Sequence, residues 1–123
     1  MEKIAFELIN KYVTGWQKND INQICSCLLE NCAVTESHGT TYCGVQNIEN
    51  WFRFWLATKS KVIKWDILSF HYCDMEKTAF FEWDFACIAN NIEYSIPGII
   101  VVKFAHNKIA SIKEYRMTKA AHK

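Results

Sequence analysis

The sequence predicts an α+β fold in which three helices pack on one face of a curled antiparallel sheet. Apolar residues recur at helical spacing up to residue 57, whereas from residue 61 onward they alternate along four long runs. The connections between these runs have two to four residues, so neighbouring strands must be antiparallel. A chain of 123 residues is expected to form one domain, over residues 1–123.

The first half of the chain has the pattern of short amphipathic helices. A first helix is expected over residues 2–18, and Asp20 is the expected N-cap of a second helix that extends to Leu28. A brief β segment follows at 33–36, and a third helix is expected over 45–57. The predicted buried stripe of the first helix comprises Ile4, Leu8, Tyr12 and Trp16.

The second half has the alternation of long strands. They are expected at 61–72, 79–88, 92–104 and 109–117. Strands of about 12 residues would reach roughly 40 Å, which exceeds the usual strand length, so the sheet must coil strongly. Pro97-Gly98 lies within one run, and we expect a β-bulge there to provide the bend. A curled sheet closed by helices forms a cone with a cavity inside.

Composition narrows the possible functions. Aromatic residues make up 15% of the chain, with five Trp and eight Phe, more than so small a protein can hide in its core. The surplus must line a cavity or cover a partner surface. The net charge is +1 without a basic block, which argues against binding to nucleic acid. No apolar run approaches the roughly 20 residues that span a bilayer, and no secretory signal is evident, so we expect a cytoplasmic protein.

Several kinds of chemistry lack a motif in this sequence. The four histidines have no metal-ligand spacing, and neither a phosphate-binding glycine loop nor a nucleophile elbow is present. We therefore expect no metal and no cofactor. The six cysteines include no Cys-x-x-Cys pair and are expected to be free thiols.

A series of short motifs occurs in a characteristic order. They are Tyr12-Val13 with Trp16, Asn19-Asp20, Ala33-Val34 before Glu36, Tyr42-Cys43-Gly44, Glu82-Trp83-Asp84-Phe85, and Asn107-Lys108-Ile109 before Glu114-Tyr115. In this order the chain resembles the nuclear transport factor 2-like superfamily, especially its SnoaL-like branch of polyketide cyclases and ketosteroid isomerases. The resemblance covers nearly the whole chain and implies a cone-shaped, cystatin-like roll.

The resemblance also implies roles for individual residues. Glu36 falls on the position of the carboxylate base of the ketosteroid isomerases, and Tyr12 falls on the position of their tyrosine hydrogen-bond donor. Their second donor, a protonated aspartic acid, maps to Ile100 or Val101, neither of which can donate. The implied function is a cofactor-free isomerase or cyclase that acts on a small apolar carbonyl compound by proton transfer.

Plainer interpretations remain open. Glu36 could be a strand-end carboxylate that pairs with a lysine, and Tyr12 could be a core ring whose hydroxyl reaches water. The protein could bind a small molecule without catalysis, or it could be a homodimeric interaction module. A water-adding epoxide hydrolase is disfavoured, because no Asp-Arg-Asp set is evident and the chain has two arginines.

The orientation of the strand at 79–88 decides what lines the cavity. One face carries Phe81, Trp83, Phe85 and Cys87, and the other carries Phe80, Glu82, Asp84 and Ala86. The resemblance places the second face inside, leaving the aromatic face for a homodimer interface; the opposite orientation, one residue away, has an aromatic core. The expected substrate-binding residues are therefore Trp16, Trp51, Phe52, Trp55, Glu82, Asp84, Glu114 and Arg116.

Overall fold

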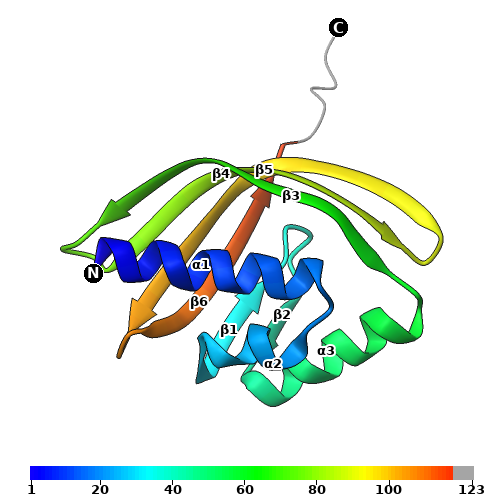
Figure 1. Cartoon of the computed structure of the whole chain (residues 1–123), viewed down its shortest axis with the longest axis horizontal. Helices are drawn as coiled ribbons and strands as arrows, with labels where there is room; N and C mark the ends of the chain where they lie inside the picture. Colours follow the sequence, from blue (N-terminus) through cyan, green and yellow to red (C-terminus); the bar gives the residue numbers. More distant parts are fainter. Residues whose placement is uncertain (118–123) are drawn as a thin grey trace, which may run out of the picture.

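The structure is a computed structural model that describes residues 1–117, and it has three helices and six strands (Figure 1). In chain order they are α1 (Glu2–Gln17), α2 (Ile21–Ser26), β1 (Leu28–Thr35), β2 (Thr41–Cys43), α3 (Val45–Ala57), β3 (Lys61–Cys73), β4 (Thr78–Ala89), β5 (Ile92–Ala105) and β6 (Lys108–Arg116). The predicted α+β class is confirmed, and the third helix has the predicted bounds. No helix in this part of the chain is long and apolar enough to cross a bilayer.

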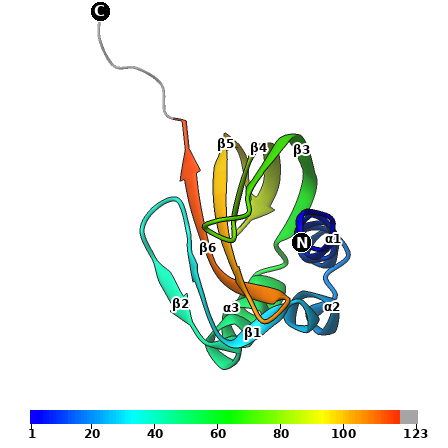
Figure 2. The same ribbon diagram turned by 90° about the vertical axis from the view of Figure 1, so that its left-hand side faces the viewer.

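The six strands form one curled sheet that does not close into a barrel. Its order is β2-β1-β6-β5-β4-β3, and the meander from β3 to β6 is antiparallel, as its short turns predicted. The sequence did not reveal that β1 pairs with β6 in parallel. Figures 1 and 2 show the helices on the concave side of the sheet, with α1 crossing beneath the arch of β3, β4 and β5.

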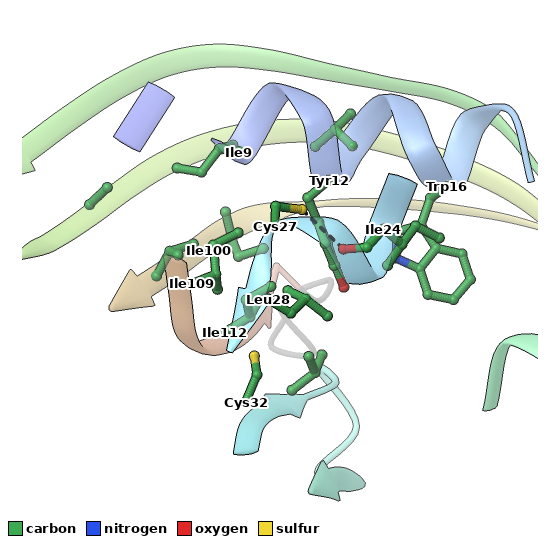
Figure 3. Packing of buried hydrophobic residues seen from close by; sticks show 14 of the residues in the cluster. Ile9, Tyr12, Trp16, Ile24, Cys27, Leu28, Cys32, Ile100, Ile109 and Ile112 are labelled. Atoms are coloured by element: carbon green, nitrogen blue, oxygen red, sulfur yellow. Dashed lines mark hydrogen bonds between the residues drawn. The ribbon is translucent and has the colours of Figure 1, made fainter. Parts of the chain in front are cut away.

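Helix α1 fills the concave side with an apolar face. Figure 3 shows Tyr12 and Trp16 extending from α1 toward the interior, where Ile24 and Ile112 also lie. The predicted stripe is correct at its C-terminal end, whereas Ile4 is 40% exposed. The buried positions of α1 are Ala5, Ile9, Tyr12, Val13, Gly15 and Trp16.

The predicted cap between the first two helices is confirmed. The Asp20 carboxylate accepts a hydrogen bond from the Gln23 backbone N–H at 3.1 Å. Helix α2 is shorter than predicted, because the chain leaves it at Cys27 and Leu28 already belongs to β1. The Ile109 N–H donates to the Cys27 carbonyl at 2.9 Å, so pairing with β6 begins where the helix ends.

The predicted bulge at Pro97-Gly98 is wrong. Pairing between β4 and β5 continues in register through both residues, because Trp83 lies opposite Gly98 and Asp84 lies opposite Pro97. The register shifts of the meander lie in β3, at 62–64 and 67–69, and between β5 and β6 at 103–104. The sheet is therefore bent mainly at its outer strand rather than at the proline.

The predicted orientation of β4 is also wrong. Its buried positions are Ala79, Phe81, Trp83 and Cys87, so the aromatic face lies inside. Burial of these large apolar side chains, with Glu82 left in solvent, gives a lower free energy than the reverse. The face expected to form a dimer interface is thus core and cavity wall. The homodimer remains a prediction, but the aromatic face of β4 no longer supports it.

Gly98 is required for the close approach of β5, β6 and the Trp83 indole. A Cβ atom at Gly98 would lie 2.0 Å from the Tyr115 carbonyl oxygen and 2.5 Å from Trp83 Nε1. We predict that Gly98→Ala lowers the free energy of unfolding by about 2 kcal/mol or more, because backbone atoms must move. Urea unfolding measures the change. Ser95→Ala, at an exposed position of the same strand, is the control and should change stability by less than about 0.5 kcal/mol. Equal stabilities of the two variants would contradict the close approach.

Candidate active site

The concave side of the sheet encloses an aromatic cavity of about 390 Å³. All five tryptophans of the chain line it, from α1, α3, β3 and β4. The surplus of aromatic residues therefore lines a cavity, one of the two alternatives that composition allowed. The lining residues are Tyr12, Trp16, Glu36, Ser37, His38, Trp51, Trp55, Trp65, Trp83, Phe85, Cys87, Ala89, Tyr94, Ile96, Glu114 and Arg116.

Glu36 lies at the cavity wall directly after β1. The turn that begins there is closed by two backbone hydrogen bonds, from Glu36 N–H to the Thr40 carbonyl and from Gly39 N–H to the Glu36 carbonyl, both at 2.8 Å. Gly39 has a φ of +105°, which favours glycine. Glu36 Oε1 accepts a hydrogen bond from the Tyr42 hydroxyl at 3.1 Å and lies 3.0 Å from His38 Nε2. The carboxyl group is thus held by its neighbours in a partly buried position.

Glu114 is the second carboxyl group of the cavity, and its pKa is raised to about 8. The main cause is loss of hydration on burial, and the second is the negative charge of Glu36. A hydrogen bond from the Ser37 backbone acts in the opposite direction. At neutral pH Glu114 is therefore mainly a neutral carboxylic acid, which can donate a hydrogen bond or a proton.

The register of the sheet places the two carboxyl groups side by side. In the parallel pair, Val34 lies opposite Ile112 and Thr35 lies opposite Lys113. The next residue along the chain is Glu36, directly after β1, in one case and Glu114 of β6 in the other, and both line the cavity. Side chains two residues apart on a strand share a face, so the buried Val34 and Ile112 indicate the inward direction for both acids.

Two tyrosines face this pair. Burial, and then the charge of Glu114, raise the pKa of Tyr12 well above its usual value, so its hydroxyl stays protonated. Burial and the nearby Glu36 raise the pKa of Tyr42 to about 12. The Tyr42 ring stacks on Trp51 with centroids 4.3 Å apart, which holds its hydroxyl toward Glu36.

The tryptophan wall has hydrogen-bonding capacity that the described protein groups do not use. The buried indole N–H groups of Trp16, Trp55, Trp65 and Trp83 have no acceptor within residues 1–117. A buried donor without a partner costs free energy, and because these N–H atoms are themselves buried they lie within the packed wall rather than at the open cavity.

Seven of the ten predicted site residues line the cavity. They are Glu36, Tyr12, Trp16, Trp51, Trp55, Glu114 and Arg116. Phe52 is core instead, with its ring 5.4 Å from that of Trp16 and only 2% of its surface exposed. Glu82 and Asp84 lie on the outer face of the sheet, where Glu82 accepts from the Ser69 hydroxyl at 2.9 Å and Asp84 pairs with Lys64 at 2.8 Å. Their predicted place in the cavity is wrong because β4 has the other orientation.

Sequence reasoning missed several lining residues for the same reason. Trp65 lies opposite Phe85, and Trp83 belongs to the face assigned to the outside of the sheet. The observed register explains the orientation, because the inward Glu114 lies opposite Ile100, and Ile100 lies opposite Phe81 rather than Glu82. The sequence alone did not provide this register, because it includes a shift at 103–104. Directly opposed residues share one face of a sheet, so an inward Glu114 requires an inward Phe81.

Other reactive groups in the cavity are inert or lack partners. Burial, and then the charge of Glu36, raise the pKa of the Cys87 thiol to about 11, which disfavours a nucleophilic thiolate. All six cysteines are free, as expected. Within residues 1–117, no group of three His, Cys, Asp or Glu side chains could hold a metal ion.

Comparison with known proteins supports the fold. No protein-family model and no curated protein sequence matches this chain. An LEH-like epoxide hydrolase from M. tuberculosis has a TM-score of 0.82 at 11% identity, with 94% of this chain and 84% of that chain covered. A proposed polyketide cyclase from Xanthomonas campestris pv. campestris has a TM-score of 0.77 at 16% identity, covering 93% and 90%.

A third solved structure adds a bound small molecule. It is a protein with a ketosteroid isomerase-like fold from Catenulispora acidiphila, in complex with trimethylamine, with a TM-score of 0.76 at 14% identity and coverage of 89% and 84%. A further match, from Methylobium petroleophilum, has a cystatin-like fold. The predicted fold resemblance is therefore confirmed. Because these sequence identities are below 20%, the structural similarity shows the fold alone, and the activity must be argued from the site.

We predict that Glu114 makes the stability of the protein depend on pH. The unfolded chain ionises this group near its ordinary value of 4.5, whereas the folded protein holds the proton up to about pH 8. The free energy of unfolding should therefore fall as pH rises from about 5 to 8, by about 1 kcal/mol per pH unit from this group. Urea unfolding at several pH values should show that Glu114→Gln removes this slope. The exposed Glu93→Gln is the control, and a slope unchanged in Glu114→Gln would contradict the assignment.

We also predict that the charge of Glu36 contributes to the raised pKa of Glu114. Removing the charge of Glu36 in Glu36→Gln should lower the pKa of Glu114, because one cause of its elevation is lost, while desolvation keeps it above the ordinary value. Carboxyl-carbon NMR titration of the parent and the variant measures this directly. An identical Glu114 titration in both proteins would mean that the two groups are too far apart to interact.

Proposed function

We propose that this protein binds a small, largely apolar carbonyl compound and catalyses a proton transfer on it, as a cofactor-free isomerase or cyclase. The observation that carries the proposal is the pairing of Glu36 with a neutral Glu114 at an aromatic cavity. One carboxyl group can accept a proton and the other can donate one at the same pH. Apolar walls admit a hydrophobic ligand and exclude much of the water that would compete for these groups.

In this proposal Glu36 is the base. Its carboxylate removes a proton from the carbon next to the carbonyl, and the electron pair of that C–H bond moves to form an enolate. The neutral Glu114 carboxyl and the Tyr12 hydroxyl donate hydrogen bonds to the developing oxyanion. In a substrate whose enolate is conjugated with a C=C bond, Glu36 returns the proton to the far carbon of that bond, the double bond shifts, and the isomerisation is complete. In a substrate with a second carbonyl, the enolate carbon attacks that carbonyl carbon, its C=O π electrons form an alkoxide, and the alkoxide takes the proton back from Glu36 to complete the cyclisation.

The position of Glu114 supports this assignment. The second donor implied by the family resemblance would fall at Ile100 or Val101, neither of which can donate, and Glu114 lies directly opposite Ile100 on the neighbouring strand. A neutral acid one strand away can therefore serve the same oxygen. Loss of one such donor costs roughly a hundred- to a thousandfold in rate, so its presence decides whether the chemistry is feasible.

Non-catalytic binding of a small molecule is the second candidate. The observation in its favour is the aromatic wall of the cavity, which can bind an apolar ligand without any reaction. The complex of a protein of similar fold with trimethylamine is consistent with small organic ligands. The two candidates predict the same affinity for a carbonyl compound and differ in whether its protons exchange.

Hydrogen–deuterium exchange separates them. With 2-tetralone as the probe in D₂O, we predict that the protein accelerates exchange of the protons next to the carbonyl, followed by NMR. Glu36→Gln should reduce the accelerated rate by about a hundredfold or more, because the base is lost, while 2-tetralone still binds. The outward-facing Glu93→Gln should retain the parent rate. Binding without exchange above the buffer rate would reject catalysis on such ketones and favour the second candidate.

A further inference from the structure

The cavity has a cationic side chain that the proposed reaction does not use. Arg116 is the last residue of β6, two positions beyond Glu114, and its exposed side chain lines the cavity. The strand end is held in place, because the Met117 N–H donates to the Pro97 carbonyl at 2.9 Å and Arg116 lies opposite Gly98. The backbone of Arg116 is therefore held beside an apolar cavity, and its side chain is exposed.

The charges around the cavity leave Arg116 without a counter-ion. Glu36 is engaged by Tyr42 and His38, and burial keeps Glu114 mainly neutral at pH 7. Asp84, on the outer face of β4, pairs with Lys64. Within residues 1–117, no carboxylate lies within ion-pair distance of Arg116.

We propose that the natural substrate carries a carboxylate, which Arg116 binds at the mouth of the cavity while the apolar body enters among the tryptophans. This inference rests on the proposed function, because it names the class of compound on which Glu36 would act: an apolar keto acid or similar enolisable carboxylate. A guanidinium forms two parallel hydrogen bonds to a carboxylate, which fixes the orientation of the ligand as well as its charge. The reacting carbonyl then faces the acid pair from a defined direction.

The arrangement selects against other charge types. A cationic ligand would meet Arg116 at the entrance, and a neutral ligand would leave the guanidinium unused. An anionic ligand also keeps Glu114 neutral, because a second negative charge would disfavour its ionisation. Affinity for the carboxylate should therefore fall as the pH rises through about 8, where Glu114 ionises. The other titratable or charged groups facing this space are Tyr12, Glu36, His38, Cys87, Tyr94 and Arg116.

A matched pair of probes tests the inference. 4-Acetylbenzoate and 4-acetylbenzamide have nearly the same shape, and only the first carries a charge. We predict that the parent binds the carboxylate about tenfold or more tightly than the amide at pH 7, measured by NMR titration. Arg116→Met should bind both equally, with the loss confined to the carboxylate. Lys113→Met, which removes an exposed lysine pointing to the other face of the same strand, should keep the preference.

The outcomes separate this inference from the proposed function. Equal affinities in the parent, no binding of either probe, or a preference that survives Arg116→Met would overturn the carboxylate assignment. Methyl-proton exchange of both probes in D₂O is read in the same samples. Accelerated methyl-proton exchange without a preference for the carboxylate probe would support the proposed proton transfer and reject a carboxylate as the substrate class. A preference that depends on Arg116, without exchange, would support a carboxylate-binding pocket and reject the catalysis.

Discussion

The parallel pairing of β1 with β6 is the constraint on which the site depends. Val34 beside Ile112 brings the end of the first strand next to the end of the last one, and two glutamates follow on the inward face. Without this pairing Glu36 would project from a loop into solvent, and Glu114 would lose the neighbouring charge that helps to keep it neutral. The same contact continues the curl of the sheet around α1, so the cavity and its acid pair have one structural origin.

Two carboxyl groups in one apolar space are expensive unless one of them holds a proton. Here the two carboxyl groups have different surroundings. Glu36 receives a hydrogen bond from Tyr42 and lies beside His38, whereas Glu114 faces the aromatic wall with a single backbone donor. Glu114 therefore keeps its proton at neutral pH, because burial and the charge of Glu36 both raise its pKa. This difference is a property of the fold around the two groups, and it needs no group beyond the chain's own residues.

Most of the architecture could be predicted from the sequence. Period and turn length indicate α1, α3 and the four-strand meander, and Asp20 marks the start of α2. The parallel contact could not be predicted, because it joins segments about 80 residues apart and no local pattern reports it. The orientation of β4 was predicted wrongly for a different reason. Both faces of that strand carry aromatic residues, so alternation alone leaves the choice open. The observed register from Glu114 through Ile100 to Phe81 decides it, and turn length could not give that register because it shifts at 103–104.

The closing of the sheet by its first and last strands also has a consequence for biosynthesis. As the ribosome releases the chain, β1 can pair with β2, but its other edge stays open until β6 has emerged. Contacts of such long sequence separation form late, after the entropy of the intervening loop has been overcome. A nascent chain that stops short of β6 has neither Glu114 nor Arg116. The pocket therefore cannot be complete before β6 has paired with β1, and a chain truncated before β6 leaves one wall of the cavity missing.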